Sequence, residues 1–251
     1  RNIKAKKSIN IGKKDISFAD VIIFVRGADP YMENIAKSAN NAGKYCIMYL
    51  DDDLLNVPFG GEERYKNALK GCLYWCHLLW SSNINILKKY ASFMKYPNCI
   101  EEKAFEPTQI LMPIFECCQP VRIVYAGSPS HASNLQKYIV PALNQVWLKN
   151  NKIEVTFIGL RQIDLKDIQF PVQFIHWFDD YKKYHEFITN HRYHIGIAVI
   201  QDQEFYRCKF YNKFLEYGKM GVLGIYSDCQ PYSLVVKDHL NGLLSKNTKE
   251  D

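Results

Sequence analysis

Two lysines and a glutamate are spaced so that one helix would hold them on a single face. Lys209, Lys213 and Glu216 stand at i, i+4 and i+7 within a predicted helix over Tyr206–Lys219. Aromatic residues repeat this spacing on the apolar side of the same helix, at Phe210, Phe214 and Tyr217. The pattern predicts a helix with one packed face and one polar face.

The start of this predicted helix is unusually basic. Arg207 and Lys209 fall in its first turn, where the helix dipole disfavours a cation by roughly 0.3–1 kcal/mol. A bound phosphate would make the cations favourable at this position, because it would accept hydrogen bonds from backbone N–H groups and charge-assisted hydrogen bonds from the lysines. The alternative is a solvated cationic patch, and electrostatics alone leaves both interpretations open.

Glu216 lies one turn further along the predicted helix. Its carboxylate could accept hydrogen bonds from two neighbouring hydroxyls, which is the geometry of a ribose diol. The competing interpretation is an ion pair with Lys213, three residues earlier, which would stabilise the helix by only tenths of a kcal/mol.

A glycine–serine loop follows another predicted strand. Gly127 and Ser128, with His131 shortly after them, connect the strand Val121–Tyr125 to a helix. Glycine lets the backbone approach a ligand closely, and the loop amides can hold a phosphate near the helix start. An ordinary connection between strand and helix has the same residues, and a loop histidine is usually solvated.

Three consecutive aspartates end a predicted strand in the first part of the chain, at Asp51, Asp52 and Asp53. Such carboxylates could bind Mg²⁺ or position an acceptor hydroxyl. Successive side chains of an extended strand alternate in direction, so the three cannot all face one ion. The alternative is that Asp52 or Asp53 caps the turn Leu54–Asn56.

Short apolar runs alternate with segments of helical period, which is typical of βαβ units and a parallel sheet. In the first part we expect a sheet of three strands, Val21–Val25, Tyr45–Leu50 and about Cys76–Trp80, with helices at about Tyr31–Ala42, Glu62–Lys70 and Asn83–Phe93. The second part predicts strands at Val121–Tyr125, Glu154–Ile158, Val172–Ile175, Ile195–Ile200 and Val222–Tyr226, and helices at Asn134–Lys149, Tyr181–Asn190 and Tyr206–Lys219.

The proline-punctuated stretch between these two parts has no clear period and is typical of a linker. We therefore expect an α/β protein with two Rossmann-like domains. Residues 1–108 form the first domain, 109–120 a linker and 121–251 a second domain. In an open α/β sheet, ligands bind beyond the carboxyl ends of the strands.

Composition narrows the classes of protein and partner. The formal net charge of +6 suits phosphate-bearing small molecules or an anionic membrane face better than a nucleic-acid duplex, so we expect no nucleic-acid partner. The eight cysteines, some of them inside apolar runs such as Cys72 and Cys76, indicate reduced thiols in a cytoplasm and no zinc site. A basic opening segment suggests a solvated tail, or peripheral contact with the inner face of a membrane.

Several motifs together resemble the bacterial GT-B glycosyltransferases of the GT4-like group (glycosyltransferase group 1). They are the segment KFYNKFLEYGKMGV from Lys209 to Val222, the segment YAGSPSH from Tyr125 to His131, and NGLL from Asn241. The aspartate-rich strand end at Asp51 and Asp52 supports the resemblance, which covers nearly the whole chain.

The resemblance implies transfer of a sugar from a nucleotide-diphosphate sugar to a glycan or lipid-linked acceptor, in polysaccharide biosynthesis, without a cofactor or a divalent metal. It implies that Glu216 holds the donor ribose beside Tyr217, and that Lys209 and Lys213 meet the diphosphate. Gly127, Ser128 and His131 would lie near that diphosphate, Ile175–Trp177 near the nucleobase, and Asp51 and Asp52 on the acceptor side. One departure is Cys208, where many relatives carry a second glutamate.

Two rival functions remain. The first is a non-catalytic GT-B subunit or nucleotide-binding interaction module. It is favoured by Cys208 and by the first domain, which the resemblance implies is partial. The second is a metal-dependent GT-A transferase that uses Asp51–Asp53.

Overall fold

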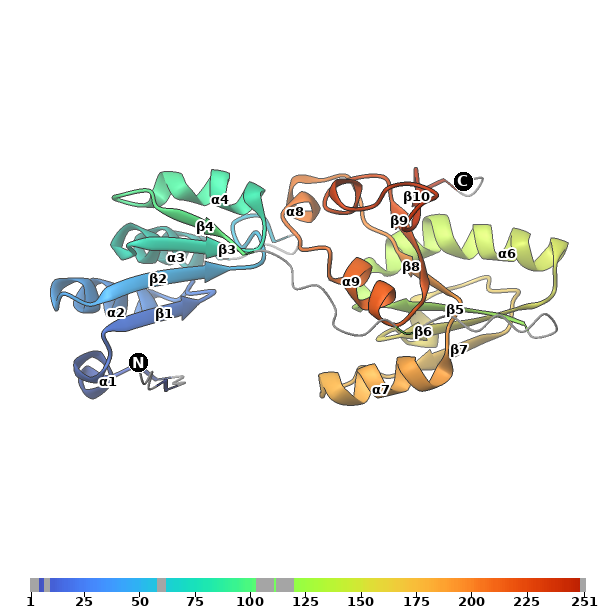
Figure 1. The fold of residues 1–251 in the computed structure, drawn as a ribbon, viewed down its shortest axis with the longest axis horizontal. Helices are drawn as coiled ribbons and strands as arrows, with labels where there is room; N and C mark the ends of the chain where they lie inside the picture. Colours follow the sequence, from blue (N-terminus) through green and yellow to red (C-terminus); the bar gives the residue numbers. More distant parts are fainter. Residues whose placement is uncertain (1–4, 7–9, 58–61, 103–110, 112–119, 249–251) are drawn as a thin grey trace. The chain divides into compact units, whose positions relative to one another are not determined.

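The computed structural model describes residues 5–6, 10–57, 62–102, 111 and 120–248. The chain divides into two compact units (Figure 1). Unit 1 comprises Arg1–Ala104 with Cys208–Phe210, and unit 2 comprises Phe105–Arg207 with Tyr211–Asp251. The expected linker, 109–120, lies outside the described residues except for Leu111 and Pro120.

Unit 1 contains a parallel sheet in the order β1-β2-β3-β4. Its strands are β1 Val21–Val25, β2 Tyr45–Leu50, β3 Leu78–Ser81 and β4 Cys99–Glu101. The expectation of three strands was wrong, because β4 was missed. That strand has three residues, all of them exposed, so no apolar alternation marks it in the sequence.

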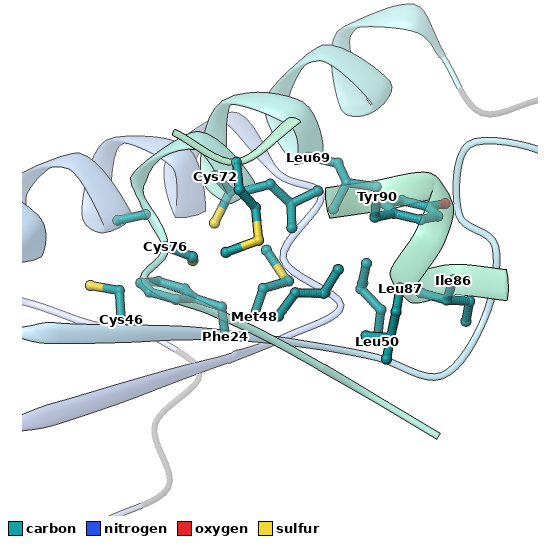
Figure 2. Packing of buried hydrophobic residues seen from close by; sticks show 14 of the residues in the cluster. Phe24, Cys46, Met48, Leu50, Leu69, Cys72, Cys76, Ile86, Leu87 and Tyr90 are labelled. Carbon is teal, nitrogen blue, oxygen red and sulfur yellow. The ribbon is translucent and has the colours of Figure 1, made fainter. Parts of the chain in front are cut away.

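The helices of unit 1 pack on one face of this sheet. They are α1 Lys13–Phe18, α2 Pro30–Asn41, α3 Glu63–Trp75 and α4 Ile84–Tyr90, followed by the 3₁₀ turn η1 Ala91–Phe93. One core cluster joins Phe24 and Met48 of the strands to residues of α2, α3 and α4, including Ala36, Leu69 and Tyr90 (Figure 2). Local signals start two of the helices, since the side chains of Asp29 and Asn83 cap α2 and α4.

Unit 2 contains a parallel sheet in the order β10-β9-β8-β5-β6-β7. Its strands are β5 Val121–Ala126, β6 Ile153–Ile158, β7 Val172–Ile175, β8 Ile195–Ala198, β9 Leu223–Ser227 and β10 Leu243–Ser245. The chain winds outward from β5 to β7 and then returns to place β8 on the other side of β5. This is the strand order of the doubly wound Rossmann fold, and its switch point lies between β5 and β8.

Both faces of the second sheet are covered. The helical segments are α5 Ala132–Asn134, the π turn η3 Leu135–Ile139, α6 Val140–Lys149, α7 Tyr181–His191, α8 Glu204–Arg207 and α9 Asn212–Lys219, with 3₁₀ turns η2 Pro129–His131, η4 Gln162–Asp164 and η5 Tyr232–Leu234. Val124 of β5 packs in one core cluster with residues of α7 and α9, whereas its neighbour Ile123 packs in another with residues of η3 and α6. Successive residues of a strand point to opposite faces, so this sheet has a core on each side.

The predicted helix Tyr206–Lys219 is in fact two helices. α8 ends at Arg207 and α9 begins at Asn212. The intervening Cys208–Phe210 group with unit 1, and Cys208 is buried in the core of that unit. The expectation that Lys209, Lys213 and Glu216 share one helical face was therefore wrong, as was the placement of Arg207 and Lys209 in the first turn. Tertiary packing overrides the helical period at this point.

Candidate functional site

A cavity of about 360 Å³ lies within unit 2, at the carboxyl ends of three neighbouring strands. Ala126 of β5 and Ile158 of β6 form part of its wall, and the loop after β7 contributes Trp177, Phe178 and Asp179. Side chains from α7 and α9 complete the lining. The cavity therefore occupies the position at which open α/β sheets bind ligands.

Two glycines allow the strand-end loops to approach one another beside this cavity. Gly127 N–H donates to Ile158 O at 3.0 Å, and Gly159 N–H donates to Ile175 O at 2.9 Å. Gly159 has a φ of +86°, and a Cβ added there would lie 2.5 Å from Gly127 O and 2.8 Å from Cε3 of Trp177. No other residue fits without a shift of the backbone or the indole. Sequence reasoning singled out Gly127 but missed Gly159.

Aromatic rings form one side of the cavity. Trp177 is 58% exposed and Tyr181 is 60% exposed, although both line the cavity. The ring of Phe178 lies 6.0 Å from that of Tyr184 and 5.2 Å from that of Phe187, measured between centroids. Phe178 is thus anchored in the core, whereas Trp177 and Tyr181 present apolar ring surface that a planar ligand could cover.

Three polar groups of the cavity lining, from α7 and α9, are joined by hydrogen bonds next to these aromatic rings. Lys213 Nζ donates to Glu216 Oε2 at 2.6 Å and to Tyr184 Oη at 2.9 Å. Tyr184 Oη donates to the same Oε2 at 3.1 Å. Within the described part of the chain, all hydrogen bonds of the Glu216 carboxylate thus go to Oε2. The ion pair that competed with the ribose interpretation is present, and it leaves Oε1 available as an acceptor.

Burial controls the protonation of the tyrosines in this group. It raises the pKa of Tyr184 far above the usual phenol value, and the charge of Glu216 acts in the same direction. The pKa of Tyr181 is raised by the same two causes in the same order. Both hydroxyls are therefore neutral and able to donate a hydrogen bond at physiological pH.

The remaining residues predicted for donor binding have different surroundings. Ser128, two residues after the cavity residue Ala126, precedes η2, and its hydroxyl forms a hydrogen bond with that of Ser130. The ring of His131 lies 5.7 Å from that of Tyr206, between centroids. Tyr217 is fully buried, and its hydroxyl donates to Ile197 O at 3.1 Å. That tyrosine belongs to the core of unit 2.

Asp51 and Asp52 follow β2 in unit 1 and are bound by cations. Arg26 donates to both oxygens of Asp51, at 2.6 and 2.7 Å, and its Nη2 also reaches Asp52 at 3.2 Å. Lys209 Nζ donates to Asp52 Oδ1 at 3.1 Å. The hydrogen bonds from Arg26 hold the pKa of Asp51 below its usual range, against the opposing effect of burial.

The third aspartate is part of the core of unit 1. Asp53 is 0% exposed, and it accepts hydrogen bonds from Lys89 Nζ at 2.7 Å and from Tyr90 Oη at 2.6 Å. Tyr90 Oη in turn accepts the backbone N–H of Leu55 at 2.9 Å. The side chain of Asp53 thus accepts hydrogen bonds from a lysine and a tyrosine and does not cap a helix start. The capping alternative was therefore wrong for this residue.

The described residues contain no group of three or more histidine, cysteine, aspartate or glutamate side chains placed to hold a metal ion. Cys72 and Cys76 lie in the hydrophobic core of unit 1. In the same part of the chain, no helix combines the length and the apolar character needed to cross a bilayer.

No protein-family model matches the sequence, and no curated protein matches it at a significant level. Solved structures do match the fold. TarM superposes with a TM-score of 0.62 at 12% identity, over 94% of this chain and 47% of TarM. The pneumococcal O-GlcNAc transferase GtfA, solved with UDP and GlcNAc, gives 0.55 at 12% identity, over 84% of this chain and 42% of GtfA.

A third similar structure is the UDP-forming α,α-trehalose-phosphate synthase from Burkholderia xenovorans. It gives a TM-score of 0.56 at 8% identity, over 92% of this chain and 63% of the synthase. The chain thus spans about half the length of TarM and GtfA and under two thirds of the synthase. These similar structures are glycosyltransferases of GT-B type. The two parallel sheets and these superpositions identify the fold as GT-B, with two Rossmann-like domains of which the first is partial.

Proposed function

We propose that unit 2 binds a nucleotide-diphosphate sugar and that the protein transfers the sugar to a glycan or lipid-linked acceptor. The observation that carries this proposal is the cavity beyond β5, β6 and β7, whose lining combines aromatic rings with the Lys213–Glu216 pair. A nucleotide offers complementary groups, namely a flat base, a diol and two phosphates. The GT-B fold favours the same function.

Each group of the nucleotide has a candidate partner in the cavity. The exposed indole of Trp177 provides a surface on which the base stacks. The carboxylate of Glu216, with Oε1 available, accepts the ribose hydroxyls. Lys213 supplies positive charge for the diphosphate, close to the first N–H groups of α9. Uridine is the base we favour, because GtfA was solved with UDP and the synthase is UDP-forming.

The proposed reaction is transfer without a divalent metal. Lys213 and the helix start stabilise the leaving diphosphate electrostatically, in the role that a metal ion would otherwise fill. Asp51 and Asp52 stay acceptor-side candidates, although both are now engaged with Arg26 or Lys209. The fold is of GT-B type, so the GT-A alternative is not retained. Activity that survives EDTA would support the metal-free proposal.

Calorimetric titration with UDP, GDP and TDP tests the binding site. We expect one of them to bind and Glu216→Ala to weaken its binding about 10- to 150-fold, since a hydrogen bond to a charged group contributes about 1.5–3 kcal/mol. Glu186→Ala is the matched control, because Glu186 is an exposed carboxylate of α7 outside the cavity. Lack of binding by all three nucleotides, or equal binding by the Glu216 variant, would refute the assignment.

One observation favours a second candidate, a non-catalytic GT-B subunit that works with a partner. Cys208 occupies the position where the resemblance implies a catalytic-site glutamate, and it is 1% exposed in the core of unit 1. The GtfA/B complex, a similar structure with a TM-score of 0.54, is an assembly. A radiolabelled sugar nucleotide separates the two candidates. Transfer or hydrolysis identifies an enzyme, and binding without turnover identifies a subunit.

The setting proposed for either function is polysaccharide biosynthesis in the cytoplasm, with peripheral contact at the inner face of the membrane. The net charge of +6 supports attraction to anionic lipid. Sedimentation with anionic vesicles at low and high salt checks this contact, which should weaken as salt screens the charges.

A further inference from the structure

The cavity of unit 2 contains a second tyrosine that the proposed binding of a nucleotide does not use. Tyr181 lines the cavity together with Tyr184, and it is the first residue of α7. The side chain of Asp180 caps this helix by accepting the N–H of Lys182 at 2.7 Å. The start of α7, and with it the backbone of Tyr181, is therefore held beside the cavity.

Tyr181 and Tyr184 share one face of α7, because residues three apart on a helix are neighbours. Their ring centroids are 5.9 Å apart, and Tyr184 Oη lies 3.1 Å from Glu216 Oε2. Burial and then the charge of Glu216 raise the pKa of the Tyr181 hydroxyl, so this hydroxyl is within reach of the field of the carboxylate. Tyr181 thus lies one helical turn from Tyr184 and near the same carboxylate.

The two tyrosines differ in what they can offer a ligand. Tyr184 Oη donates its hydrogen to Glu216 Oε2 and accepts from Lys213 Nζ at 2.9 Å. A phenol carries a single hydrogen, so Tyr184 has none left for a ligand in this arrangement. Tyr181 is 60% exposed and lines the cavity. It is therefore the tyrosine whose hydroxyl can donate to a bound molecule.

A ribose diol requires both kinds of hydrogen-bonding partner. Each hydroxyl donates one hydrogen and accepts at its oxygen, whereas a carboxylate such as that of Glu216 only accepts. Lys213, the cation of the lining, already donates to Glu216 and Tyr184, and the proposed function directs its charge to the diphosphate. A neutral phenol near the carboxylate supplies the donor that the diol still needs.

We propose that Tyr181 is a specificity-determining residue for the ribose of the nucleotide. Its hydroxyl donates a hydrogen bond to one ribose hydroxyl oxygen, while Glu216 Oε1 accepts from the diol. The inference rests on the proposed function, and it gives the site a preference for the full diol over a sugar that lacks the hydroxyl bound by Tyr181. The competing role for Tyr181 is stacking, in which its ring covers a flat group and its hydroxyl is not used.

Calorimetric titration of the wild-type protein and of Tyr181→Phe tests the hydroxyl, because this substitution keeps the ring. The probes are the diphosphate that the wild-type protein binds, UDP by expectation, and its analogues without the 2′- or the 3′-hydroxyl. Tyr181→Phe should weaken the binding of UDP about 2- to 10-fold, the usual contribution of one neutral hydrogen bond. For one of the two analogues it should change nothing, because the partner hydroxyl is already absent.

A matched control is Tyr96→Phe, at a tyrosine of unit 1 that is 69% exposed, and it should leave all three affinities unchanged. Unchanged affinity of Tyr181→Phe for UDP would overturn the proposal. A loss of affinity in Tyr181→Leu would then identify stacking as the role of the ring. An equal loss in Tyr181→Phe for all three probes would also overturn the proposal, because it would show no dependence on either ribose hydroxyl.

The same titrations separate a failure of this inference from a failure of the proposed function. If the wild-type protein binds none of UDP, GDP and TDP, the proposed function is wrong and Tyr181 has no such role. If the protein binds one of them and Tyr181→Phe shows no coupling to either ribose hydroxyl, only the role of Tyr181 is wrong.

Discussion

Charged groups lie at the carboxyl ends of the strands in both sheets, but their environments differ. In unit 1, Asp51 is held by both donors of an arginine fork and Asp53 is fully buried against a lysine and a tyrosine. In unit 2, Glu216 uses one carboxylate oxygen for its neighbours and lines a cavity. A carboxylate whose two oxygens both accept hydrogen bonds from protein groups mainly stabilises the fold. A carboxylate with one oxygen still available as an acceptor can bind a ligand.

The largest effect is expected on the free energy of unfolding, from removing the buried carboxylate of unit 1. Asp53→Ala removes the carboxylate to which Lys89 and Tyr90 donate, and removing one partner of a buried pair costs about 3–5 kcal/mol. The free energy of unfolding, measured by urea denaturation, should fall accordingly. Asp20→Ala, at an exposed aspartate, is the control. If Asp53→Ala leaves the free energy of unfolding unchanged, this aspartate does not stabilise the fold. The proposed difference between the carboxylates of the two units would then be wrong.

The second-largest effect is expected in unit 2, on the affinity for the nucleotide, with folding unaffected. Trp177→Ala removes the exposed ring proposed to stack on the base, and such stacking contributes about 1–3 kcal/mol. The Kd for UDP should rise about 5- to 150-fold, and Trp177→Phe should restore part of the affinity. Tyr96→Ala, at a tyrosine of unit 1 that is 69% exposed, should leave the Kd unchanged. An equal loss in both alanine variants would argue against stacking at Trp177.

A smaller effect is expected at the hydroxyl that joins Lys213 to Glu216. Tyr184→Phe keeps the ring and removes the hydrogen bonds to both side chains. One such bond contributes about 0.5–1.5 kcal/mol, so UDP affinity should fall about 2- to 10-fold. Tyr96→Phe is the control, because Tyr96 is an exposed tyrosine of unit 1 outside the cavity. Unchanged affinity for Tyr184→Phe would show that Glu216 is positioned without this tyrosine.

The smallest effect should be a pH dependence at the half-exposed pair of Arg26 and Asp51. Because the folded state lowers the pKa of Asp51, the pair stabilises the protein above the unfolded pKa of about 3.9. This contribution disappears as the pH falls through the lower, folded pKa. Solvent screening limits it to about 1 kcal/mol or less. Asp51→Asn should flatten the unfolding free energy below about pH 4, and Asp20→Asn should leave that slope unchanged.

Much of the fold was predictable because its signals are local. The bounds predicted for β1, β2 and β7 agree with the structure, since each is a short apolar run between turn residues. The break between α8 and α9 was not predictable, because the residues around Cys208 have helical spacing and leave the helix only through packing with unit 1. The strand β4 carries no apolar pattern of its own.

The residues of the candidate site were likewise only partly predictable from the sequence. Sequence reasoning proposed Glu216 and Lys213 from their spacing, and the structure brings both to one cavity. It assigned Lys209 to the same face, but that lysine contacts Asp52, which is 157 residues distant in the sequence. Tyr184 was missed, since only the packing of α7 against α9 brings its hydroxyl to Glu216.

Local periodicity and composition were enough to predict the alternation of strands and helices, the two Rossmann-like parts and a net charge that suits a phosphate-bearing ligand. The tertiary structure was needed to show which carboxylates already accept hydrogen bonds on both oxygens and which have one oxygen available. That distinction depends on contacts between residues far apart in the chain, as between Arg26 and Asp51 or Tyr184 and Glu216. Such contacts depend on the strand order, which local sequence signals do not determine.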